Sequence, residues 1–400
     1  MADNSPIEWT DATWNPITGC TLVDDGCRNC YAAELAATRL KNHPSRKGLA
    51  RRNAVGIAKF TGEVRLNERW LLDPLKWSKP RMIFVCAHGD LFHPSVPDEW
   101  IYRVFGIMAS CPWHTFQVLT KRPDRAQQFL EKAHFGVMGE ATDIVCDPCR
   151  PLTGKVALSA QPQHDKLAQS HGKHVLRLHQ WPLANVWLGT SISDQISADE
   201  RVSDLLTANA AVRFVSAEPL LGRIQLDRLC EFVDTFEDAG GHPDPAWPLA
   251  AQDATWLNAL SGKMGAEARG PSGDRLGSSE VGLEFLGGKL DWVICGGESG
   301  RRARPMHADW ARSLRDQCLE AAVAFHFKQW GAWLPEDQAC PSLLDGSPVD
   351  SIDQWNWSEA EELGALHFWG DHSASIRLAK KHSGRFLDGR TWDQFPESAA

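Results

Sequence analysis

Three cysteines lie within eleven residues near the amino end of the chain, at Cys20, Cys27 and Cys30. A glycine precedes each of the first two, at Gly19 and Gly26. Thiolates that converge on one centre need a backbone that turns sharply and approaches that centre closely, and glycine permits both. The residue types and their spacing therefore predict a metal-binding loop.

The number of thiols leaves three interpretations of this loop open. A structural zinc ion takes four protein ligands, and residues 19–31 contain no fourth cysteine or histidine, so zinc would need a distant ligand. A 4Fe-4S cluster is usually held by four cysteines, and three leave one iron open to an exogenous ligand. The cysteines can also be small buried residues without a metal. The short loop favours a chemically active cluster.

The composition indicates a large protein without a membrane-spanning segment. Of the 400 residues 43% are hydrophobic, and no apolar run approaches the roughly 18 residues that a membrane helix needs. The amino-terminal residues lack the basic and apolar regions of an export signal, so we expect a cytoplasmic protein. In that reducing compartment the eleven cysteines are expected to be ligands and core residues.

The net charge of −9 argues against bulk electrostatic binding to DNA. It is compatible with a local basic surface, because the field at a cleft depends on nearby charges. A basic segment does follow the cysteine loop, with Arg46, Lys47, Arg51, Arg52 and Lys59 among Gly and Asn residues. This segment is either a solvated loop or a phosphate-facing loop beside the metal site.

Seven short segments set the expected fold: one that alternates apolar and polar residues, at 7–16, and six apolar runs that lead into polar residues. They cover residues 7–16, 82–86, 116–119, 186–188, 213–215, 292–295 and 325–327. Their alternation with helical patterns makes seven strand-then-helix units and predicts a parallel sheet. Reactive residues follow nearly every run, and no Gly-x-Gly-x-x-Gly follows the first. The pattern favours an α/β fold, a partial or complete parallel (β/α) barrel.

The same pattern suggests how the chain is divided. We expect the barrel core to occupy residues 1–335, with insertions at 136–180 and 231–289. The first insertion holds Cys146 and Cys149, a Cys-x2-Cys pair with later histidines, which predicts a possible second zinc site. The second is rich in Gly, Pro, Asp and Ser. Residues 336–400 are expected to form a C-terminal extension packed on the barrel.

Active sites of parallel barrels collect at the carboxyl ends of the strands. The candidate residues that the seven runs bring to this end are Cys20, Cys27, Cys30, His88, Asp90, His93, Lys121, Arg122, Ser191, Glu218, Gly296, Gly297, Glu298, Arg301, Arg304 and Lys328. The cysteines are the candidate metal ligands.

Four of these residues are candidate catalytic groups. His88, Asp90 and His93 form a possible proton relay, since histidine titrates near neutral pH. Alternatively, Asp90 and His93 only tie the end of a strand to its helix. Lys328 is either an electrostatic group or a buried partner of Glu298.

Four basic residues are candidate substrate ligands. Lys121, Arg122, Arg301 and Arg304 follow strand ends, where they can hold phosphate or carboxylate groups. The alternative for each is a solvated loop charge.

Eight motifs together resemble a phage-borne, largely uncharacterised three-cysteine-motif family. They are 9–16 (WTDATWNP), 19–20 with 26–31 (GC and GCRNCY), 90–93 (DLFH), 119–123 (LTKRP), 186–189 (VWLG), 214–222 (FVSAEPLLG), 291–300 (DWVICGGESG) and 327–331 (FKQWG). They occur in the family's order, and the resemblance extends over most of the chain outside the two insertions. The family is in turn similar to radical S-adenosylmethionine (SAM) enzymes.

The resemblance implies a partial α/β barrel with a 4Fe-4S cluster on the cysteine loop and SAM at the open iron. It implies cofactor-binding roles for Ser191, Glu218, Gly296, Gly297 and Glu298, with a carboxylate accepting hydrogen bonds from the SAM ammonium group or, alternatively, capping a helix. Two features differ from most radical SAM enzymes. Six residues separate the first two cysteines instead of three, and Gly-Gly-Glu follows a late strand instead of the second.

Three functions therefore compete. The first is a radical SAM-like iron–sulfur enzyme that modifies a nucleic acid base or nucleotide by hydrogen abstraction, with a reductant such as flavodoxin or ferredoxin as partner. The second is a zinc-stabilised protein without catalysis that binds nucleic acid or recruits a partner. The third is a metal-dependent hydrolase that uses His88, Asp90 and His93 as ligands.

Overall fold

The structure is a computed structural model, and it describes residues 5–138, 181–234, 252–269, 275–284, 288–338, 365–378 and 383–397. Cys146 and Cys149, and most of the insertion expected at 136–180, lie outside these residues. Within the described part, no helix combines the length and the apolar composition needed to cross a membrane.

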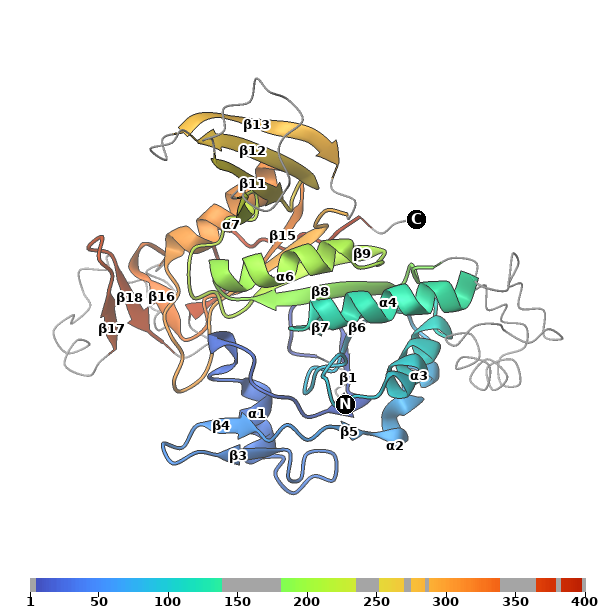
Figure 1. The fold of residues 1–400 in the computed structure, drawn as a ribbon. Helices are drawn as coiled ribbons and strands as arrows, with labels where there is room; N and C mark the ends of the chain where they lie inside the picture. The colour runs from blue at the N-terminus through green and yellow to red at the C-terminus, as the bar shows by residue number, and fades with distance from the viewer. Residues whose placement is uncertain are drawn as a thin grey trace.

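Seven parallel strands form one curled sheet (Figure 1). In order across the sheet they are β1 (Ala12–Trp14), β6 (Met82–Val85), β7 (Thr115–Thr120), β8 (Val186–Ile192), β9 (Val212–Ala217), β14 (Trp292–Gly296) and β15 (Ala324–Gln329). Spatial order equals sequence order, so the fold is a partial parallel (β/α) barrel. All seven strand predictions are confirmed, although β1 is shorter than the segment at 7–16.

Helices cover the outer face of this sheet. They are α3 (Asp98–Ala109), α4 (Pro123–Met138), α6 (Gln195–Thr207) and α7 (Ala308–Glu320), which follow β6, β7, β8 and β14. Their apolar side chains recur every three or four residues, and Val104, Met108, Val202 and Leu205 are fully buried. The short helices α1 (Tyr31–Ala37) and α2 (Glu68–Leu71) lie between β1 and β6.

Two of the seven expected strand-then-helix units are wrong in the part of the chain that is described. After β9 the chain enters an antiparallel sheet of β10 (Leu229–Asp234), β11 (Gln252–Asn258), β12 (Lys263–Arg269) and β13 (Arg275–Glu284). This sheet is drawn at the top of Figure 1 and occupies most of the expected insertion at 231–289. After β15 the chain enters β16 (Trp333–Pro335). The Gly- and Ser-rich composition masked the strands, since their pairing depends on cross-strand neighbours.

Aromatic side chains fill the half-barrel toward the amino ends of its strands. Trp292 is fully buried, and its ring lies 6.2 Å from that of Trp9, 6.0 Å from that of Trp187 and 5.6 Å from that of Phe214. These residues belong to a cluster separate from the core between sheet and helices. They account for part of the high tryptophan content.

The interior becomes smaller and more polar toward the carboxyl ends of the strands. The strand register places Ser191, Ser216, Ile294 and His326 side by side on four neighbouring strands. Side chains alternate between the two faces of a strand, so these residues share the inner face with the aromatic layer. The half-barrel therefore offers a polar interior beneath the ends where the site residues were expected.

The C-terminal extension packs on the barrel where it is described. Strands β17 (Leu366–Phe368) and β18 (Ala374–Arg377) form a sheet with β16. Further on, the Phe327 amide donates to Trp392 O at 2.9 Å, and the Gln394 amide donates to Phe325 O at 3.3 Å. Residues 392–394 thus pair with β15, which has only one neighbour in the seven-stranded sheet.

The aromatic cluster inside the half-barrel predicts the effect of adding one methyl group at Gly189. A Cβ at Gly189 would lie 2.5 Å from the Phe214 ring, so we expect Gly189→Ala to lower the free energy of unfolding by about 1–3 kcal/mol through overpacking. Phe214→Leu in the same chain makes room, so the double variant should lose less than the sum of the two single losses. Urea unfolding measures both effects.

Gly370→Ala is the control for this measurement, because an added Cβ there meets nothing within 4 Å. Additive losses in the double variant would contradict contact between residues 189 and 214.

Candidate functional site

The cysteine loop lies at the carboxyl end of β1, between β2 (Ile17–Thr18) and α1. Cys27 ends a single 3-10 turn, η1 (Asp25–Cys27), and Cys30 immediately precedes α1. Gly19 has a positive φ of 99°, and a Cβ there would overlap Glu63 O at 2.0 Å. The loop therefore needs glycine at this position, as the sequence predicted. All three cysteines are free and partly exposed.

The three thiols are close enough to interact electrostatically. Burial raises the pKa of Cys20 to about 12, and the charges of Asp90 and Cys27 act in the same direction. Burial also raises the pKa of Cys30, again with a contribution from Cys27. Cys27 thus lies near enough to both of the other thiols to affect their pKa. A metal ion deprotonates the thiols that bind it, so its charge would outweigh the effect of burial on their pKa.

The three thiols are not arranged as a ready-made site for one ion. Thiolates bound to one zinc at about 2.3 Å lie roughly 4 Å apart. In the described ranges, one group of three His, Cys, Asp or Glu residues has all its ligand atoms within 4.8 Å, and this group does not contain the cysteines. In a cluster each cysteine binds a different iron, so its thiols are farther apart than around one ion.

Asp24 anchors the cysteine loop to β7 and α6. Its carboxylate oxygens each accept from Lys121 Nζ at 2.9 Å, and one lies 2.6 Å from Arg201 Nη1. The same carboxylate accepts from the Cys27 amide at 3.1 Å. Burial would raise the pKa of Asp24, but the Lys121 and Arg201 charges outweigh it and lower that pKa to about 2. Lys121, expected at the substrate, therefore holds the loop.

Arg122 forms a second anchor through Asp90. The buried Asp90 carboxylate accepts from Arg122 Nη1 at 2.6 Å, from Thr120 Oγ1 at 2.7 Å and from the Phe92 amide at 3.0 Å. Arg122 in turn reaches Cys20 Sγ at 3.8 Å and donates to Thr21 Oγ1 at 2.7 Å. The geometry supports the structural alternative for Asp90, because its oxygens are occupied by fixed donors.

His93 completes this second anchor. Its Nε2 lies 3.0 Å from Thr21 Oγ1, and its Nδ1 accepts from the Ser95 amide at 3.1 Å. Burial and the Arg122 charge lower the pKa of His93. Both ring nitrogens are used locally, which favours positioning of the loop over a proton relay or a metal ligand.

His88 is held as a neutral ring. Its Nδ1 accepts from Arg46 Nε at 3.2 Å, and its amide donates to Asn15 Oδ1 at 2.9 Å. Burial, together with the Arg46 charge, lowers the pKa of His88 to about 3. This arrangement does not favour the expected role as a relay that titrates near neutral pH.

Glu298 and Arg304 form a third anchor, from the loop after β14. The Glu298 carboxylate accepts from Arg304 Nη2 at 2.7 Å and Nε at 2.9 Å, and from Asn29 Nδ2 at 3.0 Å. Arg304 also forms an ion pair with Asp25. Asn29 and Asp25 belong to the cysteine loop, so this pair clamps it. Arg301 is exposed, and within the described residues no carboxylate pairs with its side chain.

Glu218 and Lys328 lie in the barrel interior rather than on the loop. Lys328 Nζ pairs with Glu218 Oε1 at 2.8 Å, so the expected partner Glu298 is wrong; Glu298 is taken by Arg304. A Cβ on Gly296 would lie 2.7 Å from Glu218 Oε1, which explains a glycine beside this carboxylate.

The structure also shows what surrounds Gly297 and Ser191, two other residues expected to bind the cofactor. A Cβ on Gly297 would lie 1.9 Å from Trp330 O, so this glycine permits close packing of two loops. Ser191 is a buried residue on the inner face of β8, and its carbonyl accepts from Arg201 Nη1 at 2.8 Å.

Sequence reasoning missed several residues of the site. The loop is held in part by Asp24, Asn29 and Arg201. Tyr31 follows Cys30; its side chain is 53% exposed, and its hydroxyl donates to Ala87 O at 2.6 Å. Arg201 had a readable signal, because it shares a buried helix face with Val202. A charged residue on an apolar face needs a partner.

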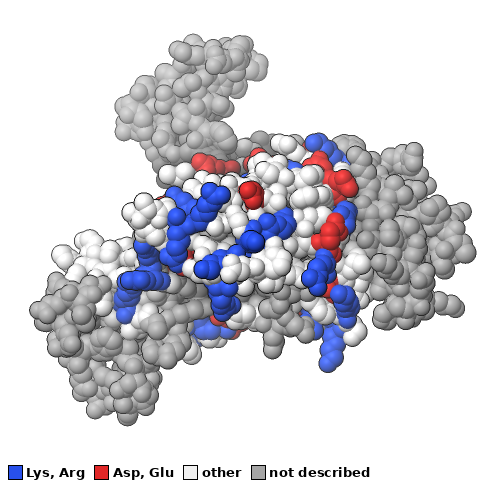
Figure 2. Space-filling view, turned by 90° about the horizontal axis from the view of Figure 1, so that it is seen from below, with Lys and Arg blue, Asp and Glu red and all other residues white. Residues whose placement is uncertain are grey.

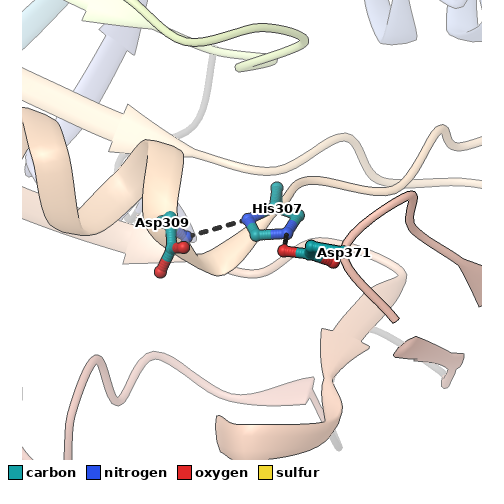
Figure 3. Close-up of side chains that lie close together, drawn as sticks. All are labelled: His307, Asp309 and Asp371. Atoms are coloured by element: carbon teal, nitrogen blue, oxygen red, sulfur yellow. Dashed lines mark hydrogen bonds and ion pairs between the residues drawn. The ribbon is translucent and has the colours of Figure 1, made fainter. Parts of the chain in front are cut away.

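One group of residues in the described ranges, His307, Asp309 and Asp371, has its candidate ligand atoms within 4.8 Å of one another (Figure 3). His307 Nδ1 accepts from the Asp309 amide at 3.1 Å and so caps α7, while Nε2 lies 3.0 Å from Asp371 Oδ2. Both nitrogens already have partners. This group ties α7 to the C-terminal extension and has no free imidazole nitrogen for a metal.

Residues 4–396 match a family described as "Protein of unknown function (DUF5131)". The chain belongs to this family. No curated protein and no solved structure matches it. The match covers the cysteine loop and all three of its anchors, and the family description names no activity. A function for this DUF5131 chain therefore has to be argued from the site.

The anchors predict how easily the thiols react. Asp24→Ala removes the cap on the Cys27 amide and leaves Lys121 and the buried Arg201 without their carboxylate. Breaking such a pair costs about 3 kcal/mol, so we expect faster alkylation of Cys20, Cys27 and Cys30 in metal-free protein. Asp24→Asn keeps an acceptor and should give an intermediate rate.

Mass spectrometry of the labelled cysteines measures these rates. Glu320→Ala, at an exposed carboxylate on α7, is the control and should label like the unmodified protein. Equal rates in Asp24→Ala and the control would contradict the anchoring role.

The state of His88 predicts a pH dependence of stability. The folded protein keeps His88 neutral down to about pH 3, whereas an unfolded histidine takes up a proton near pH 6.5. The unfolded chain then binds the extra proton, so the free energy of unfolding falls as pH drops below about 6.5. In His88→Asn this dependence should be shallower by up to about 1.4 kcal/mol per pH unit.

Denaturant unfolding between about pH 7 and pH 5 measures the slope. The control is His372→Asn, at an exposed residue. If His88→Asn has the slope of the unmodified protein, His88 titrates alike in both states and the neutral assignment fails.

Proposed function

We propose that this protein is a radical SAM-like iron–sulfur enzyme that modifies a nucleic acid base or a nucleotide by hydrogen abstraction. One observation carries the proposal: three free thiols lie at the carboxyl end of a parallel half-barrel, on a loop that ion pairs with the barrel hold in place. Active sites of parallel barrels lie at this end.

The donor set fits a 4Fe-4S cluster. Cys20, Cys27 and Cys30 would hold three of the irons, one thiol for each iron. Burial raises the pKa of both Cys20 and Cys30, and nearby cations oppose that rise. Arg122 lies 3.8 Å from Cys20 Sγ, and the charge of Lys121 acts on Cys30 in the same direction. A cluster with an iron that lacks a protein ligand supplies one-electron reduction, which radical SAM enzymes use for hydrogen abstraction from the substrate.

The barrel interior supplies polar groups for SAM. Glu218 is a carboxylate beside Gly296, and Ser191 lies on a neighbouring strand, so both can receive polar groups of the cofactor. Lys328 already neutralises Glu218 at 2.8 Å, so a SAM ammonium group would share or displace that partner. Glu298 acts differently from the first expectation. With Arg304 it keeps the cysteine loop in place.

The surroundings of the site favour an anionic substrate. Arg301 and Arg302 are exposed on the loop after β14, and Arg groups suit phosphate oxygens. The proposal includes a cytoplasmic location, because the chemistry needs a reductant such as flavodoxin or ferredoxin.

The two competing functions have less support. A single zinc ion would draw the thiols closer together than this loop holds them. A hydrolase needs free ligand atoms on His88, Asp90 and His93, and the hydrogen bonds of Asp90 and His93 already use theirs.

The proposal predicts the metal content of the purified protein. Anaerobically purified protein should contain iron and acid-labile sulfide in equal amounts and show the brown colour of an iron–sulfur protein. The triple variant Cys20→Ala, Cys27→Ala, Cys30→Ala should lose both, and with dithionite and SAM only the unmodified protein should release 5′-deoxyadenosine.

A matched control removes two buried thiols away from the loop, in Cys111→Ala, Cys318→Ala, and should keep its iron. Colourless protein with one zinc per chain would overturn the proposal in favour of the zinc alternative. Iron and sulfide without 5′-deoxyadenosine would support the cluster but not the use of SAM.

A further inference from the structure

A two-stranded hairpin beside the cysteine loop places two like charges opposite each other. Its strands are β3 (Ala50–Arg52) and β4 (Ala58–Phe60), and their register pairs Arg51 directly with Lys59. Both side chains are exposed, while Ala58 on the other face is buried. Like charges in directly opposite positions destabilise a sheet. An anion bound between them would relieve this repulsion.

The hairpin is part of a larger basic surface, which we call the basic face. Residues 28–61 contain eight Lys and Arg residues and a single carboxylate, Glu34, although the whole chain carries a net charge of −9. The exposed members of the basic face are Arg28, Arg39, Lys41, Lys47, Arg51, Arg52 and Lys59. Glu34 pairs with Arg52, and in the described part of the chain none of the other six has a carboxylate partner.

Figure 2 looks onto this side of the molecule from below. Lys and Arg side chains gather across its described surface, and Asp and Glu side chains lie mostly toward its borders. Unpaired cations concentrated on one side of an acidic protein attract a polyanion through the local field.

The basic face is joined directly to the cysteine loop. At the tip of the hairpin, Val55 O accepts from Arg302 Nη2 at 2.6 Å. The carbonyl of Arg302 in turn accepts from Asn29 Nδ2 at 2.8 Å, and Asn29 lies between Cys27 and Cys30. A ligand on the basic face is therefore held next to the proposed cluster.

Apolar groups are also exposed on the cysteine loop, at the start of α1 and on the hairpin. Leu22 and Val23 on the cysteine loop, Tyr31 and Val55 are between 39% and 66% exposed. The ring of Tyr31 is fixed by the bond from its hydroxyl to Ala87 O. Cations that follow a phosphate backbone, with an aromatic platform for bases, are the combination found in proteins that bind single strands.

We propose that the basic face binds the phosphate backbone of a nucleic acid strand, with Arg51 and Lys59 sharing one phosphate. This extends the proposed function, on which it rests, from a base or nucleotide to a polymer substrate. The strand would run along the hairpin and past Tyr31 toward the cysteine loop. Binding needs the folded hairpin and not the cluster.

Fluorescence anisotropy with a labelled single-stranded oligonucleotide tests this proposal in the full chain. We expect Arg51→Gln, Lys59→Gln to weaken binding about tenfold or more, and the slope of log K against log salt to become shallower by about 1 to 2. The free energy of unfolding should not fall, because the substitutions remove a repulsion. A duplex of the same sequence should bind more weakly than the single strand.

The control is Lys79→Gln, Lys132→Gln, which removes the same charge at two exposed positions outside the basic face and should bind like the unmodified protein. Equal losses in both double variants, or tighter binding to anionic phospholipid vesicles than to the oligonucleotide, would overturn the proposal.

The Cys20→Ala, Cys27→Ala, Cys30→Ala variant separates this inference from the proposed function. If it still binds the oligonucleotide, the basic face acts independently of the cluster, as proposed. Protein with iron and sulfide but without salt-dependent binding would sink the inference and leave the enzyme proposal standing. Salt-dependent oligonucleotide binding by protein that contains no iron would support this inference and contradict the enzyme proposal.

Discussion

The architecture of the site depends on pairing buried charges across the rim of the half-barrel. Six residues separate Cys20 from Cys27, and this segment has little apolar surface through which it could pack on the barrel. Asp24 supplies what packing cannot, since it meets cations from β7 and α6 and caps the amide of a cysteine. A buried charge that loses its partner is strongly unfavourable. The carboxylates and guanidinium groups therefore keep the loop in one position over the polar interior.

The fold was largely readable because its signal is local. A buried parallel strand is a short apolar run, as in 82–86 and 292–295, and the polar residues after it mark the rim. The antiparallel sheet after β9 escaped notice because β12 and β13 contain many Gly, Ala, Ser and Glu residues. Their pairing depends on partners distant in sequence. The tryptophans were visible, but the meeting of Trp9, Trp187 and Trp292 in the barrel interior follows from register, which no single run encodes.

The location of the site could be predicted from the sequence, whereas the roles of its residues could not. Topology alone brings Lys121, Arg122 and Glu298 to the rim near the cysteines. Whether a charge faces a ligand or another charge depends on side-chain geometry over a few ångströms. Lys328 pairs with Glu218 because Gly296 leaves room for that carboxylate. The spacing of residues along the sequence does not reveal these side-chain pairings. Because of them, several residues expected to bind a ligand hold the cysteine loop instead.

The pairing of residues 392–394 with β15 bears on how the protein forms during synthesis. All seven strands have left the ribosome before these residues are made, so a nascent half-barrel passes through a stage in which one flank of its sheet is bare. Exposed sheet edges recruit strands from other chains. A nascent or truncated chain that stops short of Trp392 would therefore be the form most in need of a chaperone.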